Sequence, residues 1–205
     1  MKLKFAVAAA VAAMSFAHVA HAEDEGNWMV RARAVNLDMA QKSDQVGGTG
    51  AFDQITVNNK VIPELDVSYF FTPNIAAELV LTVPQKQHVY LSGSDIGTFK
   101  HLPPSLLLQY HFNPEGNFRP YVGAGINYTL IGKENLNGGA LHLDNHSTGL
   151  ALQVGFDYKL DKNLYLNVDL KKAQLRSDVL NSSGAKVSSV KLDPVMFGIG
   201  LGWRF

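Results

Sequence analysis

Residues 194–205 read PVMFGIGLGWRF, and bulky apolar residues alternate in this stretch with small or charged ones. The even-numbered positions from 198 to 204 hold glycines and an arginine. The odd-numbered positions, the other parity, hold Phe197, Ile199, Leu201, Trp203 and Phe205. Because side chains alternate between the two faces of a strand, this period of two predicts a β-strand with one face that is apolar throughout. Such a face either packs on a protein core or meets lipid.

The same alternation recurs along the chain in about eight segments, several of them of ten residues or more. They span residues 28–34, 61–71, 75–83, 102–112, 118–130, 150–160, 164–170 and 195–205. Three connections, at residues 72–74, 113–117 and 161–163, are short, whereas those near 38–54, 84–98, 132–146 and 176–189 are long and polar. This sorting predicts an all-β fold, an eight-stranded antiparallel transmembrane β-barrel with short periplasmic turns and long extracellular loops.

The aromatic residues favour a membrane barrel over a soluble one. If both termini lie on the side of the short turns, the outward aromatic residues all fall at that end, namely Trp28, Tyr69, Phe71, Tyr110, Phe112, Phe118, Phe156, Tyr158, Trp203 and Phe205. A ring of aromatic residues at one level is typical of a membrane interface. A soluble barrel such as a lipocalin would scatter them.

The first 22 residues have the features of a secretory signal peptide. Lys2 and Lys4 form a positive region, residues 5–16 are apolar, and Ala20-His21-Ala22 offers a small-residue cleavage site. The alternative, an amino-terminal membrane anchor, would need roughly 20 apolar residues. We therefore expect a signal peptide at residues 1–22 and a single barrel domain at residues 23–205.

Composition excludes several classes of function. The chain has no cysteine, which removes disulfides and thiolate metal sites, and its formal net charge is zero. There is no basic stripe, so nucleic acid is not an expected partner. After Ala22 no apolar run approaches about 18 residues, which argues against a transmembrane helix.

Several motifs resemble the OmpW group of small outer-membrane proteins, and the resemblance extends over most of residues 26–205. They are HLPPSLLLQYHF (101–112), FRPYVGAGINYT (118–129), LQVGFDY (152–158), LDPVMFGIGLGWRF (192–205) and FFTPNIAAELVLTVP (70–84). The resemblance implies a barrel in the bacterial outer membrane with periplasmic termini. It also implies a narrow, partly apolar channel for small hydrophobic molecules with a lateral opening toward the bilayer, and recognition of Phe205 by the barrel-insertion machinery.

Charged residues lie on the parity that would face the lumen. An eight-stranded barrel is just wide enough for its own side chains to fill, so Arg31, Arg33 and Arg119 should pair with carboxylates, and Arg204 with an acid such as Asp157. This network is either a structural plug alone or a plug that also acts as a polar constriction and steers an apolar solute sideways, and we favour the plug that also steers. The predicted channel-lining residues are Arg33, Glu64, Asp66, Glu78, Val80, Leu107, Gln109, Arg119, Asp157, Asp169, Lys171 and Arg204.

The resemblance further implies inward apolar residues at the constriction, and Val80 and Leu107 match that role. Lys171 departs from the family pattern, in which members can carry an inward aromatic residue. A lysine there would favour a polar or anionic group on the solute. The alternative is a side chain that reaches up to the extracellular rim.

Prolines mark a possible break in the barrel wall. Proline has no backbone donor, so it weakens a strand ladder and belongs at edges, bulges or strand ends. Pro84, Pro103 and Pro104 flank the same long loop. We expect a lateral portal there, against the alternative that the strands end early.

Metal binding and catalysis are not expected. His142, Asp144 and His146 share a loop whose glycines argue against convergent imidazoles. Ser92, Ser94 and His88 share another loop without a recognised nucleophile pattern. The sequence therefore predicts a monomeric, non-enzymatic barrel without cofactors that passes small apolar solutes, with outer-membrane lipids as partners. The rival is a non-conducting structural or adhesive barrel whose loops bind host, phage or other proteins, and deletion of the loops should separate the two functions.

Overall fold

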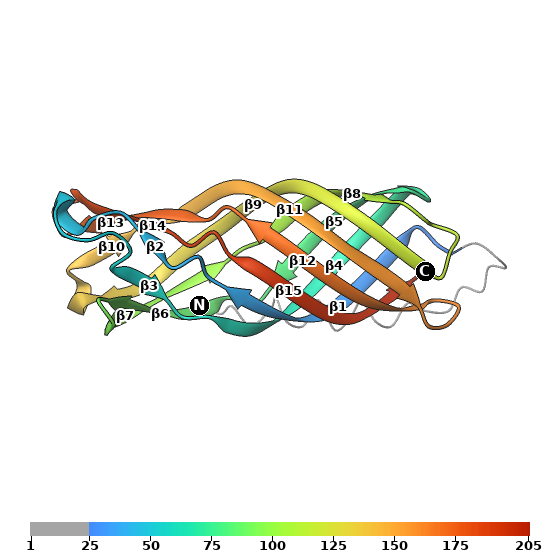
Figure 1. Cartoon of the computed structure of the whole chain (residues 1–205), viewed down its shortest axis with the longest axis horizontal. Helices are drawn as coiled ribbons and strands as arrows, with labels where there is room; N and C mark the ends of the chain where they lie inside the picture. Colours follow the sequence, from blue (N-terminus) through green and yellow to red (C-terminus); the bar gives the residue numbers. More distant parts are fainter. Residues whose placement is uncertain (1–24) are drawn as a thin grey trace, which may run out of the picture.

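Eight antiparallel strands form a closed ring in the computed structural model, which describes residues 25–205 (Figure 1). The predicted signal peptide at residues 1–22 lies outside the described residues. The ring confirms the predicted fold, and pairing of the last strand with the first closes it. Its strands are β1 (Trp28–Asp38), β4 (Lys60–Thr72), β5 (Ile75–Thr82), β8 (Ser105–His111), β9 (Phe118–Leu136), β11 (His146–Lys159), β12 (Leu164–Ala173) and β15 (Val195–Arg204).

The apolar parity points away from the lumen, as the alternation predicts. In β11, Leu150 and Leu152 are each 61% exposed, whereas the intervening Ala151 is 0% exposed. Each square ångström of such apolar surface would cost about 25 cal/mol in water. A hydrocarbon environment removes this cost, so the outer face of the ring is suited to lipid.

Both described termini lie at the end of the ring that carries the short turns, here called the turn end. Trp28 and Phe205 close the seam there: each backbone N–H donates to the carbonyl of the other, at 3.0 and 2.8 Å. The ring of Trp28 lies 4.9 Å from that of Tyr69, which in turn lies 5.2 Å from Phe71. The predicted aromatic girdle at the turn end is confirmed.

The opposite end, here called the hairpin end, is built from short strands that extend the ring (Figure 1, left). They are β2 (Lys42–Ser43), β3 (Ile55–Val57), β6 (Gln85–Leu91), β7 (Ser94–Leu102), β10 (Leu141–Leu143), β13 (Arg176–Asn181) and β14 (Lys186–Lys191), with the 3-10 helices η2 (Val46–Gly48) and η3 (Asn137–Gly139). Within residues 25–205, no helix has the length and apolar character needed to cross a bilayer.

The expectation that these connections are simply long polar loops is wrong. Their strands alternate as well, and they turn apolar side chains inward: Val57, Val89, Phe99 and Val179 are each 2–4% exposed. The reason is geometric, because a hairpin that continues a barrel wall has an inner face that must be covered. The hairpin end therefore has an apolar interior.

Candidate functional site

A belt of acidic and basic side chains crosses the lumen. This charge belt consists of inward residues from five strands, namely Arg31, Arg33, Glu64, Asp66, Glu78, Asp157, Asp169 and Lys171. Arg31, Asp66 and Glu78 are each 0% exposed. The charges are desolvated, so each must be held by a partner across the lumen.

Arg31 is at the centre of the charge belt and was missing from the predicted channel-lining set. Its Nε and Nη2 donate to the two carboxylate oxygens of Asp157 at 3.0 and 2.7 Å. Its Nη1 donates to Glu78 at 3.0 Å and to the Ser68 hydroxyl at 2.7 Å. The guanidinium thus links β1 to β4, β5 and β11, strands that are not all neighbours in the ring.

Arg33 contacts four carboxylates. Its distances are 3.1 Å to Glu64, 2.6 Å to Asp66, 3.5 Å to Glu78 and 3.4 Å to Asp169. A planar guanidinium with five donors suits this position better than an ammonium group would. Removal of Arg33 would leave several buried carboxylates close to one another.

Lys171 belongs to the charge belt and does not reach the rim. Its side chain is 1% exposed, and Nζ lies 3.1 Å from Glu64 and 3.8 Å from Asp169. The alternative of a lysine that extends to the extracellular rim is therefore wrong. Since its charge is already balanced, Lys171 offers no free cation to an anionic solute.

Val80, Leu107 and Gln109 also face the lumen, as their parity predicts. Val80 and Leu107 are 2% and 1% exposed. Gln109 Nε2 donates to Gln153 at 2.9 Å, and Gln153 donates to Glu78 at 2.8 Å. Gln109 therefore extends the charge belt toward β8.

The glycines of β15 make room for the arginine stems. A Cβ atom at Gly198 would lie 3.3 Å from Cδ of Arg33, and one at Gly202 would lie 3.2 Å from Cγ of Arg31. Both contacts are tighter than ordinary packing distance. The two faces of residues 194–205 therefore serve different surroundings, lipid outside and the charge belt inside.

Arg204 pairs with Glu25, which corrects the expected pairing with Asp157. Its Nη1 lies 3.4 Å from the Glu25 carboxylate, and its Nε donates to the Gly26 carbonyl at 2.8 Å. Asp157 is occupied by Arg31. Arg119 and Lys159 also bind Glu25, so this residue ties the start of the described chain to β9, β11 and β15.

Glu25 should stabilise the barrel only where it is ionised. Burial acts to raise its pKa, but hydrogen bonds from Arg119 and Lys159 outweigh this and lower the pKa from 4.5 to about 2. A lowered folded-state pKa stabilises the protein above the unfolded pKa and is lost as pH falls through the folded one. The stabilisation by Glu25 is therefore complete above about pH 4.5 and is lost as the pH falls from 4.5 to about 2.

We expect Glu25→Gln to lower the free energy of unfolding at pH 7 by about 1–2 kcal/mol, because the carboxylate is partly exposed and screened. The deficit should shrink from pH 4.5 downward and vanish near pH 2. Urea unfolding of the mature protein in vesicles at several pH values measures it. Glu115→Gln, in the exposed β8–β9 turn, is the control. A deficit that persists at pH 2 would contradict the assignment.

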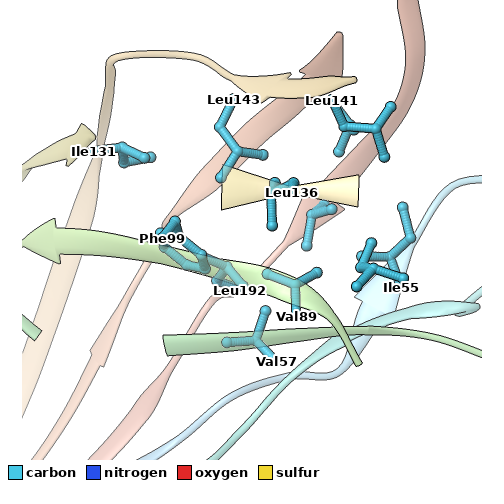
Figure 2. A pocket seen from close by; sticks show the side chains of 12 residues that line it. Ile55, Val57, Val89, Phe99, Ile131, Leu136, Leu141, Leu143 and Leu192 are labelled. Carbon is cyan, nitrogen blue, oxygen red and sulfur yellow. The ribbon is translucent and has the colours of Figure 1, made fainter. Parts of the chain in front are cut away.

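Above the charge belt, the hairpin end encloses an apolar space of about 410 Å³, which includes the part open to solvent. This upper cavity is lined by twelve residues, all of them apolar, and Figure 2 shows side chains such as Phe99, Val89 and Leu143 around it. They come from β3, β6, β7, β9, β10, β13, β14 and their connections. None of these residues was among the predicted channel-lining set, because the segments were read as polar loops.

A second space of about 420 Å³, which also includes the part open to solvent, lies between the upper cavity and the charge belt and is here called the lower cavity. Glu64 and Lys171 line it on the belt side, and Val80, Leu37 and Met196 contribute apolar surface. Thr82 and Pro103 also line it. The lower cavity therefore reaches the part of the wall where the sequence predicts a portal.

The strand ladder is interrupted at that part of the wall. Pairing of β5 with β8 ends at Val80 and Ser105, and pairing of β6 with β7 begins at Gln85 and His101. Within the described chain, residues 81–84 therefore have no register partner among residues 102–104. We call this interruption the proline gap, since it contains the predicted portal residues Pro84, Pro103 and Pro104.

One side of the proline gap is held by β9. Asn127 Nδ2 lies 3.4 Å from the carbonyl of Pro103 and 3.2 Å from that of Pro104. The backbone N–H of Tyr128 also donates to Pro104 at 3.0 Å. Residues 103–104 are thus fastened to β9, and the interruption lies only toward β5 and β6.

The loop residues considered for metal binding or catalysis have separate partners. His142 lies 3.2 Å from Glu134, Asp144 accepts from the backbone of Asp178 at 3.0 Å, and His146 stacks on Tyr128. His88 pairs with Asp95 at 2.8 Å.

Other polar residues that contribute to the lumen were overlooked. Tyr121 donates to Asp169 at 3.0 Å, and Asn167 donates to Asp157 at 2.9 Å. Both lie on the inward parity, so the alternation that located the charged residues would also have located them. Glu25 precedes the first strand, and no periodic signal marks it.

Comparison with known proteins gives consistent matches. The OmpW family model matches residues 24–205. An uncharacterized outer-membrane protein of Sinorhizobium fredii is 42% identical over 188 residues, which cover 87% of this chain and 80% of that protein. Outer membrane protein W of Vibrio cholerae is 36% identical over the whole length of both chains. The crystal structure of the outer-membrane protein OprG from Pseudomonas aeruginosa superposes with a TM-score of 0.78 at 28% identity, covering 89% of this chain and 97% of that one.

Proposed function

The chain belongs to the OmpW family of outer-membrane proteins, and we propose that it takes up small, mainly hydrophobic molecules by passive diffusion and releases them sideways into the bilayer. In this proposal the hairpin end faces the cell exterior and both described termini face the periplasm. Residues 1–22 are removed as a signal peptide, and residues 23–205 form a monomeric barrel. Phe205 is recognised by the insertion machinery.

The observation that carries the proposal is the upper cavity. All twelve of its lining residues are apolar, among them Ile55, Phe99 and Leu136. A polar solute that entered it would lose its water without gaining hydrogen bonds, at a cost of about 2–7 kcal/mol per group. An apolar solute gains from the same transfer.

The charge belt supports the lateral route. Across it, Arg31 and Arg33 hold carboxylates from β4, β5, β11 and β12 at 2.6–3.5 Å. An apolar solute could pass along the axis only by separating these pairs, which costs several kcal/mol for each buried ion left unpaired. The proline gap borders the lower cavity just above this layer, so a solute that descends has a shorter path through the wall.

The adhesive alternative needs a different test from loop deletion. The hairpins that would be deleted form the wall of the upper cavity, so their removal would abolish both functions. Changes to single inward side chains separate the functions, because the outer surface of the hairpins stays intact.

We expect Val89→Trp to reduce uptake of a hydrophobic solute by about fivefold or more, because the indole fills part of the upper cavity that Val89 lines. Accumulation of a deuterated alkane in proteoliposomes measures the change. Tyr90→Trp, on the outward parity of the same strand, is the control. Large stable ion currents through the wild-type protein, or equal uptake by the two variants, would contradict the proposal.

A further inference from the structure

His101 is a buried polar side chain in the wall of the lower cavity. It lies on β7 and is 2% exposed, and its ring centroid lies 5.8 Å from that of Phe99, which lines the upper cavity, with the two rings tilted by 41°. His101 therefore lies beside side chains of both cavities, so a solute that moves from one to the other would pass close to it.

The imidazole lacks a full set of partners. Its Nε2 lies 3.3 Å from the amide of Gln87, which is 0% exposed, whereas Nδ1 has no hydrogen-bond partner. The Gln87 carbonyl oxygen also has none. If the Gln87 amide is turned over, its oxygen accepts from Nε2, but Nδ1 stays unpaired. An unsatisfied buried polar atom costs about 1–3 kcal/mol, so a partner at Nδ1 would be stabilised.

Other polar groups of the lower cavity are already engaged. Asn127 donates to Ser105 at 2.9 Å, Thr82 donates to the Pro63 carbonyl at 2.8 Å, and Lys171 binds Glu64. Among the described residues that line this cavity, His101 is the one with a fully buried side-chain atom left unpaired.

His101 also lies next to the proline gap. It pairs with Gln85 at the point where the β6–β7 ladder resumes, and Pro103 follows two residues later. Pro103 lines the same cavity. A polar group hydrogen-bonded to His101 would therefore lie next to the proline gap, while an attached hydrocarbon chain could lie in the upper cavity.

We propose that His101, oriented by Gln87, is a polar subsite that hydrogen-bonds the single hydroxyl or carbonyl group of an otherwise apolar solute. The substrate class is thus a hydrocarbon with one oxygen-bearing head, such as a medium-chain alcohol, in preference to the bare alkane. This inference rests on the proposed uptake of hydrophobic molecules and names the kind of molecule preferred.

The transport test compares n-octanol with n-octane in proteoliposomes. His101→Leu should lower the ratio of octanol to octane uptake about fivefold, the worth of one hydrogen bond of roughly 1 kcal/mol. His111→Leu is the control, because His111 is equally buried but lies at the turn end, outside both cavities, near Gln109. An unchanged ratio in His101→Leu would overturn the proposal.

A binding measurement separates this inference from the proposed function. In protein with ¹⁵N-labelled histidine in lipid nanodiscs, n-octanol should shift the Nδ1 resonance of His101, and n-octane should not. If wild-type protein moves neither solute faster than protein-free vesicles, uptake fails as the function, and the NMR titration still decides the subsite. No octanol-specific shift would mean that the unpaired nitrogen binds water only, and the subsite would be rejected.

Discussion

Arg33→Met should lower the free energy of unfolding by about 3–5 kcal/mol, the range found when one partner of a buried ion pair is removed. Methionine keeps much of the apolar stem but leaves Glu64, Asp66 and Asp169 without their shared guanidinium. Urea unfolding in lipid vesicles, followed by tryptophan fluorescence, measures the loss.

Arg176→Met is the control for this loss. Arg176 contacts Asp193 at 3.5 Å, but its side chain is 57% exposed, so the pair should contribute less than about 1 kcal/mol. Equal losses in the two variants would show that the charge belt adds no more to stability than a surface pair does.

The double variant Pro103→Val with Pro104→Val should reduce uptake of hydrophobic solutes by up to about tenfold. Valine favours extended backbone, and the N–H of residue 103 can then donate across the proline gap toward residues 81–84, whereas residue 104 faces β9, where its carbonyl already accepts from Tyr128. One added ladder bond of about 0.5–1.5 kcal/mol shifts the open–closed equilibrium by roughly 2- to 12-fold. Initial rates of alkane transfer into the lipid of proteoliposomes measure this effect.

Pro120→Val is the matched control for that variant. Pro120 is also inside a strand, but it lies at the turn end, where it pairs with Phe156, and it does not line the lower cavity. The control should transport like wild type. If the double variant does too, the solute leaves the barrel elsewhere, and the proline gap is only a place where strands end.

Alternation was sufficient to predict the ring and its inner face. Side chains on a strand have a strict period of two, so the inward parity identified Glu64, Asp66, Glu78, Asp157 and Asp169 without knowledge of the fold. The short connections likewise fixed which strands are joined at the turn end.

Parity could not give the partners across the lumen. It assigns a face to each residue, but height and direction around the barrel depend on strand stagger. Arg204 was therefore expected near Asp157, whereas it binds Glu25, and Asp157 binds Arg31.

The hairpin end was harder to predict because its strands are short. β3 and β10 have three residues each, too few for a period of two to stand out among glycines and asparagines. The upper cavity is assembled from such pieces, brought together by pairings between distant segments. His101 was missed for a related reason, since the predicted strand spans residues 102–112 and the residue just before it was assigned to neither face.

The glycines of β15 have a consequence for how the barrel is assembled. Gly198, Gly200 and Gly202 occupy its inward positions beside Arg33 and Arg31, so this strand adds no charged group to the interior at that level. The ion pairs among β1, β4, β5, β11 and β12 can therefore form before the first and last strands meet. The final closing step then adds backbone pairing along one seam and the contacts of Arg204 with Glu25 and Gly26, and it need not disturb the buried ion pairs of the charge belt.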